Sequence, residues 1–361
     1  MPIAKPILGE SELAYVTECI KTGWVSSNGK FVKRFEEMFA EYCGSGYAVA
    51  TSNGTTALHL ALLALDLQVG DEVIVPSMTF IATANAVTYT GSTPVFVDSE
   101  PATWNIDTAQ IEAAITPKTK AIIPVHLYGH PADMDPILEI AKKHKLAVIE
   151  DAAEAHGAEY KGQVVGGIGD IGTFSFYGNK IITTGEGGMI VTNSKKYAEQ
   201  IRILRDHGMS ASRRYWHPVL GYNYRLTNIQ AALGVAQMER IESIIASRVS
   251  IAQQYEHQLK DCKGLTLPPQ EKWAKNVYWL YTVLVEKNYE ISRETLVKQL
   301  DSKGIETRPL FPPVHTQPIY NTGQTLPVAE SLYTKGISLP SFAGMKSADI
   351  HRITDIITRQ N

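Results

Sequence analysis

Short apolar runs alternate with helical patterns through the first two thirds of the chain, and this rhythm constrains the fold more than any other feature. Runs of strand length occur at GYAVATS (46–52), DEVIVPS (71–77) and TPVFVDS (93–99). Stretches with helical periodicity, about ten to fifteen residues long, separate them. Strands joined by such helices pair in parallel through right-handed crossovers. The pattern therefore predicts an α/β fold with a mostly parallel sheet.

The ends of these predicted strands carry polar and small residues. In parallel sheets, ligands bind at the carboxyl ends of the strands. We therefore expect four segments, far apart in sequence, to form one rim of a binding site. They are ATSNGTT (50–56), VPSMTF (75–80), VHLYGH (125–130) and IEDAAE (149–154).

The pattern changes near residue 230. Residues 228–261 form a long helical stretch, which we expect to be bent and to link two lobes. The runs at 277–286, 294–304 and 305–311 then indicate antiparallel strands and helices. We predict a large domain over residues 1–236 and a smaller α+β C-terminal domain over residues 237–361.

Composition and charge exclude several classes of function. The chain has 361 residues, 44% hydrophobic and 20% charged, as is typical of soluble globular proteins. A net charge of −3 gives no reason to expect nucleic acid or an anionic membrane as partner. The three cysteines are far apart and odd in number, which fits neither a disulfide framework nor a zinc site. With no signal-peptide pattern and no apolar run of membrane-spanning length, we expect a cytoplasmic protein.

Two weaker patterns concern cofactors. GIGDIG (167–172) matches the G-x-G-x-x-G dinucleotide fingerprint letter for letter. That fingerprint works only between a strand and a helix, whereas this segment precedes TFSFY (173–177), which has the pattern of a strand. We therefore disfavour dinucleotide binding. The ten histidines show no metal-ligand spacing, so we expect no metal.

The residue that suggests chemistry is Lys180, in the stretch GTFSFYGNKIITTGEGGMIVTN (172–193). It follows a predicted strand and precedes a turn in which Gly185, Gly187 and Gly188 permit bent backbone and close approach. A lysine amine can form a Schiff base with a carbonyl. For a lone lysine, a surface position at a strand end is the more common role.

Three further features point to one cofactor. Asp151, at a strand end, could pair with a protonated pyridine nitrogen, or could simply cap a helix. Gly54 and Thr55 stand where a strand turns into a helix, and with Ser175 they could bind a phosphate, or form an ordinary turn. Phe80 could stack on a flat ring, or belong to the core. Together with the lysine, these features specify pyridoxal 5'-phosphate (PLP).

The sequence resembles the DegT/DnrJ/EryC1/StrS sugar aminotransferases along nearly its whole length. The resemblance lies in GWVSSNGKFVKRFEEMFAEY, TSNGTTALHLAL, DEVIVPSMTFIATANAV, IEDAAEAHGA, FSFYGNKIITTGEGGMI, LGYNYRLTNIQAALG and ETRPLFPPVH. It implies a PLP-dependent aminotransferase of fold type I, similar to aspartate aminotransferase, in which a large domain with a mostly parallel sheet precedes a smaller α+β domain.

The resemblance also implies roles for single residues. Lys180 is the Schiff-base and acid–base lysine, Asp151 the partner of the pyridine nitrogen, and Glu154, where many relatives have glutamine, lies near the cofactor's 3-hydroxyl. Asn223 matches a position that reaches the phosphate of a neighbouring subunit's cofactor, and Arg225 one that receives a substrate carboxylate. This implies a homodimer, with a tetramer possible. The residues carried over as cofactor-binding are Gly54, Thr55, Phe80, Asp151, Glu154, Ser175, Lys180 and Asn223.

Within the family, the motifs are most similar to a branch that aminates GDP-4-keto-6-deoxy-D-mannose with L-glutamate, a step toward lipopolysaccharide O-antigen. We expect Arg308 near the pyrophosphate, His315 near the hexose and Trp24 as a flat wall, although ordinary packing is an alternative for each. A UDP- or dTDP-linked keto-sugar, or a non-catalytic PLP-binding module, also remains open. A related branch of 3-dehydratases has histidine in place of the lysine, so Lys180 argues against that reaction.

Overall fold

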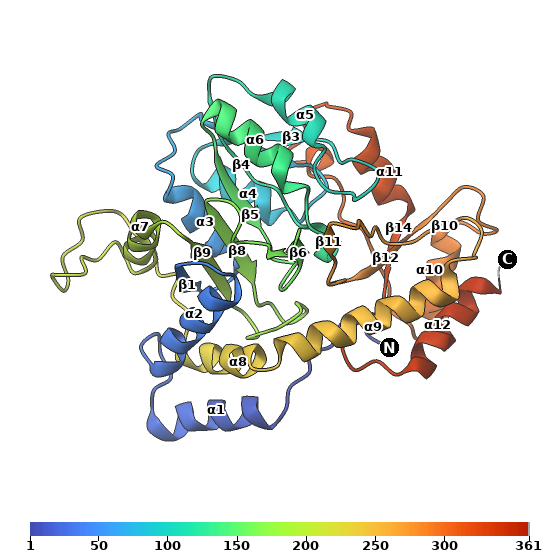
Figure 1. Ribbon diagram of the computed structural model, residues 1–361, viewed down its shortest axis with the longest axis horizontal. Coiled ribbons are helices and arrows are strands. Elements are labelled where there is room, and N and C mark those ends of the chain that lie inside the picture. The colour runs from blue at the N-terminus through green and yellow to red at the C-terminus, as the bar shows by residue number, and fades with distance from the viewer. Residues whose placement is uncertain (360–361) are drawn as a thin grey trace.

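A seven-stranded sheet forms the centre of the computed structural model, which describes residues 1–359. Its strand order is β1-β9-β8-β5-β4-β2-β3 (Figure 1). Within this sheet only β9 runs against its neighbours, so the predicted mostly parallel sheet is confirmed. The strands are β1 (Tyr47–Thr51), β2 (Glu72–Pro76), β3 (Thr93–Val97), β4 (Thr119–Ile122), β5 (Ala147–Asp151), β8 (Ile171–Ser175) and β9 (Gly188–Thr192).

Helices cover this sheet. Helix α3 packs against β8 and β9, α7 against β1 and β9, and α4 against β2 and β3. Elsewhere α2 packs against β1 and α6 against β4 and β5, while α1 and α2 both pack against α8. The bounds are α1 (Glu10–Thr22), α2 (Lys30–Tyr42), α3 (Gly54–Leu63), α4 (Ala82–Tyr89), α5 (Thr108–Ile111), α6 (Met134–His144), α7 (Lys195–Arg205) and α8 (Asn228–Met238).

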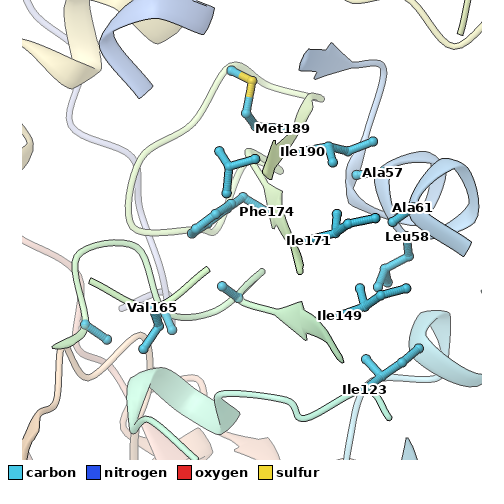
Figure 2. Packing of buried hydrophobic residues seen from close by; sticks show 14 of the residues in the cluster. Ala57, Leu58, Ala61, Ile123, Ile149, Val165, Ile171, Phe174, Met189 and Ile190 are labelled. Atoms are coloured by element: carbon cyan, nitrogen blue, oxygen red, sulfur yellow. The ribbon is translucent and has the colours of Figure 1, made fainter. Parts of the chain in front are cut away.

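Burial on both faces of the sheet explains why its strands appear in the sequence as short apolar runs. All residues of β8 and β9 are buried, as expected for strands covered on both faces. Figure 2 shows Ile149, Ile171 and Ile190 from neighbouring strands lying toward Ala57 and Leu58 of α3. Burying one isoleucine side chain stabilises the fold by about 1.5–3 kcal/mol. The helix is thereby fixed against the strand ends that form the site.

The C-terminal part has a sheet and core of its own. An antiparallel sheet, in the order β10-β12-β14-β13, packs with α9, α10 and α12 around a second cluster that extends from Ile251 to Ile357. A third, small sheet β11-β6-β7 joins the two parts. The bounds are β6 (Glu159–Tyr160), β7 (Gln163–Val164), β10 (Leu265–Thr266), β11 (Ala274–Lys275), β12 (Tyr281–Val285), β13 (Arg308–Pro309), β14 (Gly336–Leu339), α9 (Ile241–Leu259), α10 (Arg293–Ser302), α11 (Pro327–Lys335) and α12 (Ser347–Thr358).

The predicted bent link is present, because the helical stretch breaks between Met238 and Ile241, where α8 ends and α9 begins. The division at residue 236 stays a prediction, and packing crosses it in both directions. Trp279 and Leu310 belong to the first core. The amide of Glu306 donates to the carbonyl of Met1, so the N-terminus lies with the C-terminal part (Figure 1).

None of the helices within residues 1–359 combines the length and apolar character needed to cross a bilayer.

Candidate active site

A cavity of about 450 Å³ lies where the strands of the central sheet end. All four predicted rim segments contribute to it, because Asp151 ends β5 and the other three segments follow β1, β2 and β4. Ser175, at the end of β8, also lines the cavity. The C-terminal part supplies one wall. The lining includes Gly54, Thr55, Phe80, Tyr128, Asp151, Glu154, Ser175, Lys180, Glu186, Trp279, Arg308 and Phe311.

Lys180 lies in the loop between β8 and β9, with its amine inside the cavity. Its side chain is only 12% exposed, and Nζ lies 3.8 Å from Glu154 Oε1. Burial lowers the pKa of Lys180, while the negative charges of Glu154 and Asp151 act in the opposite direction. Because the side chain is buried inside the cavity, the surface-lysine alternative is excluded.

The turn after Lys180 needs its glycines. Gly185 has a φ of +83°, in the left-handed region that favours glycine. At Gly188, a Cβ would lie 2.3 Å from the carbonyl oxygen of Asn53. The turn therefore brings β9 tightly against the start of α3.

Asp151 is a buried carboxyl with capacity for another hydrogen bond. Thr83 Oγ1 donates to Oδ2 at 2.8 Å, and the amide of Ala153 donates to Oδ1 at 3.2 Å. Burial raises the pKa of Asp151, while the two donors and the charge of Lys180 oppose the rise. No helix begins directly after Asp151 in the described chain, so the alternative role as a helix cap does not apply.

Glu154 is held between a backbone donor and the lysine. The amide of Tyr128 donates to Oε2 at 2.9 Å, while Oε1 faces Lys180. Burial raises the pKa of Glu154, and the nearby charge of Lys180 opposes this. Burial thus favours the protonated carboxyl, and a charged Lys180 favours the carboxylate, so the protonation of Glu154 is linked to that of the lysine.

The start of α3 provides a cradle for an anion. Gly54 and Thr55 are its first two residues, whose N–H groups have no acceptor within the helix. Asn53 caps the helix by accepting from the amide of Thr56 at 2.9 Å. A Cβ on Gly54 would lie 2.7 Å from Ser175 Cβ, so only glycine lets the helix start approach β8 this closely.

Phe80 presents an aromatic surface to the cavity. It is 54% exposed and lies 5.6 Å from Phe311, ring centre to ring centre. It is therefore not a core residue, and a flat ring could stack against it.

These features fit PLP. Lys180 offers an amine for the aldehyde, Asp151 a buried acceptor for the ring nitrogen, and the helix start a site for the phosphate. Two further wall residues, Tyr128 and Trp279, were not singled out from the sequence. Tyr128 lies within the predicted rim segment 125–130 without being named as a site residue, and Trp279 lies in an apolar segment where no local pattern distinguishes it from core residues.

Some predicted substrate residues lie elsewhere. Arg308 lines the cavity, and its contact with the substrate pyrophosphate stays a prediction. His315 does not: it is 1% exposed, with Nδ1 2.6 Å from Ser77 Oγ and Nε2 3.2 Å from Glu330. The expectation that His315 contacts the hexose is therefore corrected, because both ring nitrogens already have partners in the packing between the two parts of the chain.

Trp24 also lies away from the cavity. It is 59% exposed and borders a separate hollow beside α1 and α8, together with Cys19 and Asn228. Within one chain it does not form the predicted wall, because its loop is attached to Asn228, whose Nδ2 donates to the Trp24 carbonyl at 2.7 Å.

Asn223 and Arg225 lie outside the cavity, on the chain segment that pairs with Thr51 beside the helix start. Arg225 forms an ion pair with Asp206 at 2.9 Å, and its Nε donates to Asn223 at 3.0 Å. Their proposed contacts concern a second copy of the chain and stay predictions.

Comparison with known proteins gives the family. The model of the DegT/DnrJ/EryC1/StrS aminotransferase family matches residues 6–358. A GDP-perosamine synthase of Caulobacter vibrioides is 52% identical over 354 residues, covering 97% of this chain and 95% of that protein. A GDP-perosamine synthase of Escherichia coli O157:H7 is 48% identical, covering 99% and 97%. A putative sugar aminotransferase from Streptococcus pneumoniae, solved in its PLP form, is 28% identical with a TM-score of 0.94, covering 100% and 98%. The chain belongs to the DegT/DnrJ/EryC1/StrS aminotransferase family.

Proposed function

We propose that the protein transfers the amino group of L-glutamate to the C4 ketone of GDP-4-keto-6-deoxy-D-mannose and so makes GDP-perosamine. The observation that carries the proposal is the amine of Lys180, placed within one cavity beside Glu154 and Asp151. The relatives that are 48% and 52% identical over almost the whole chain support the choice of sugar.

PLP, when bound, supplies an electron sink and a carrier for the amino group. The chain's own residues bind, orient and move protons. Asp151 keeps a proton on the ring nitrogen, and Phe80 and the start of α3 hold the ring and the phosphate. Lys180 Nζ takes the proton from Cα of glutamate, and in the second half reaction it returns a proton to C4 of the sugar.

The surroundings of Lys180 suit this role. A general base must be neutral before it accepts a proton, and burial lowers the pKa of Lys180 toward the working range. The carboxyls of Asp151 and Glu154 stabilise the ammonium that forms when the proton arrives. The same amine can therefore accept a proton from one substrate and donate it to the next.

We also propose a homodimer whose sites are completed by the partner copy, with a tetramer possible. The loop before Asn223 supports this, because it exposes large apolar side chains, Tyr215 at 74% and Leu220 at 84%. Such exposure is typical of a surface covered by another protein.

We also propose that the protein works in the cytoplasm. Cys19 and Cys43 are buried thiols, which fits a reducing compartment.

A product assay tests the proposal. Purified protein, PLP and L-glutamate are incubated with GDP-, UDP- and dTDP-linked 4-keto-6-deoxy sugars, and the amino sugars are measured by mass spectrometry. We expect the GDP-linked sugar to be aminated fastest. Faster amination of a UDP- or dTDP-linked sugar would refute the choice of substrate, and no amination of any sugar would indicate a non-catalytic module.

Lys180→Ala tests the role of the lysine, with Lys298→Ala as the matched control. We expect turnover to be lost while Lys298→Ala, which alters an exposed lysine on α10, stays at the wild-type rate. Residual activity within tenfold of wild type would contradict the role of Lys180, because that loss is only about 1.4 kcal/mol of barrier.

A further inference from the structure

Trp279 lines the cavity but has no part in the function proposed above. It is 4% exposed and precedes β12, in the C-terminal part of the chain. The centre of its ring lies 3.8 Å from Lys180 Nζ. An ammonium this close to the face of a tryptophan is attracted by the negative potential of the ring, whereas a neutral amine is not.

The indole is fixed in place on two sides. Its Nε1–H donates to the carbonyl of Asn179 at 2.8 Å, which ties the ring to the residue next to the lysine. The indole also packs on Tyr128, whose ring is stacked at 5.9 Å with 14° between the planes, and on Phe311, whose ring centre lies 6.5 Å away. The amide of Trp279 also donates to the Tyr128 carbonyl at 2.9 Å. The ring therefore cannot turn away from Lys180 without breaking these contacts.

Tyr128 is itself held firmly and extends the arrangement to Glu154. Its φ of +53° is unusual for a bulky residue. In this conformation its amide donates to Glu154 at 2.9 Å. Its ring stacks on Phe311 at 5.4 Å, and its hydroxyl accepts from the Phe311 amide at 3.3 Å. The face of Trp279 and the carboxyl of Glu154 are thus presented to Lys180 by one continuous stack.

We propose that Trp279 is a positioning residue for Lys180, whose indole face holds the protonated amine beside Glu154 and lets the neutral amine move. This inference rests on the proposed role of Lys180 as the acid–base group. Each proton that Lys180 takes up would bring the amine back to the indole, and each proton that it gives up would free it to approach the reacting carbon.

Charged groups around Lys180 also influence whether its amine is protonated. Asp151 and Glu154 favour the ammonium form, and Glu186 and Arg308 line the same cavity. Burial lowers the pKa of nearby His156 to about 3, so this ring is neutral at working pH. Trp279 acts in the same direction as the carboxyls, although it carries no charge of its own.

The test measures the Lys180 pKa in protein without PLP, so it needs neither substrate nor turnover. Lysines are acylated at a series of pH values, and the modification of each is followed by mass spectrometry, with exposed Lys298 as the internal reference. We expect Trp279→Leu to lower the Lys180 pKa by about one unit, because a cation–π contact is lost. Trp279→Phe keeps a weaker aromatic face and should lower it less.

Phe311→Leu is the matched control, because the Phe311 ring packs on both Tyr128 and Trp279, with ring centres at 5.4 and 6.5 Å, while the indole face that meets Lys180 stays in place. We expect it to leave the Lys180 pKa unchanged. A pKa that stays constant or rises in Trp279→Leu would overturn the proposal, as would an equal fall in Phe311→Leu, which would indicate general loosening. If the product assay fails while the pKa falls as expected, the proposed function is wrong and the contact between Trp279 and Lys180 stands.

Discussion

Glu150 precedes Asp151 on β5, and its carboxylate is completely buried. Four donors surround it. The amides of Ile168 and Gly169 donate to Oε1 at 2.7 Å each. The amide of Gly166 donates to Oε2 at 2.7 Å, and His126 Nε2 lies 3.0 Å from the same oxygen. The glycine-rich segment that matches a dinucleotide fingerprint therefore binds a carboxylate of its own chain.

Replacing Glu150 with glutamine should destabilise the protein strongly. His126 Nδ1 accepts from the amide of Ala132 at 3.0 Å, so the ring donates through Nε2. Both carboxylate oxygens thus face two donors each. An amide offers one oxygen and one NH₂ group, so whichever way it points, two donors lose their acceptor. A hydrogen bond to a charged group contributes about 1.5–3 kcal/mol, so the expected loss is about 3–6 kcal/mol.

Urea unfolding at one protein concentration, without cofactor, measures this loss. The Glu150→Gln midpoint is compared with wild type and with Glu41→Gln, an exposed substitution at the end of α2 that should change the free energy of unfolding by about 0.5 kcal/mol or less. A loss below about 1 kcal/mol in Glu150→Gln would refute the reasoning, since the four donors would then not depend on a charged acceptor.

Three other changes have expected outcomes. Asp151→Asn should keep the circular dichroism of wild type but greatly slow the glutamate half reaction, because an amide cannot keep the ring nitrogen protonated; equal rates would contradict this role. Gly54→Ala should weaken PLP binding in a titration and cost about 1–3 kcal/mol of stability, because its Cβ would lie 2.7 Å from Ser175 Cβ; unchanged affinity would argue against the cradle. Burial lowers the pKa of His130 to about 4 and of His156 to about 3. Because the unfolded chain binds these protons near pH 6.5 and the folded chain does not, stability should fall with decreasing pH by about 1.5 kcal/mol per histidine between pH 6.5 and pH 5. A urea midpoint that stays constant from pH 7 to pH 5 would contradict this.

The fold and the rim of the site could be predicted because their signals are local. A strand buried on both faces is apolar throughout its own length, and the residues that end it follow directly in the sequence. Asp151 could therefore be placed at a strand end without knowledge of its neighbours, whereas Ser175 was expected inside the strand 173–177 and in fact ends β8. The family motifs then assigned roles to Lys180 and Glu154, which the cavity brings together.

What could not be predicted depends on contacts between distant segments. Trp279 donates a hydrogen bond to Asn179, which is 100 positions earlier in the sequence, and the amide of Phe311 donates to Tyr128, which is 183 positions earlier. The segment of Trp279 has the apolar character of a core strand, and the rim segment of Tyr128 carries no signal for the partner of its ring, so only the folded chain shows that the indole faces the amine.

For His315, the sequence predicted a contact with the hexose that the structure does not support. The prolines before His315 restrict the conformation of its loop but do not determine what the loop packs against. In the structure it packs on Ser77, directly after β2 and 238 positions earlier. The amide of Val314 donates to the Ser77 carbonyl, which fixes the loop against that strand. Local stiffness in a sequence therefore limits the conformations of a side chain without identifying its partners. Glu150 shows the same limit, since the sequence argued against a dinucleotide site at the glycine pattern but did not identify its partner, a carboxylate 16 to 19 positions earlier.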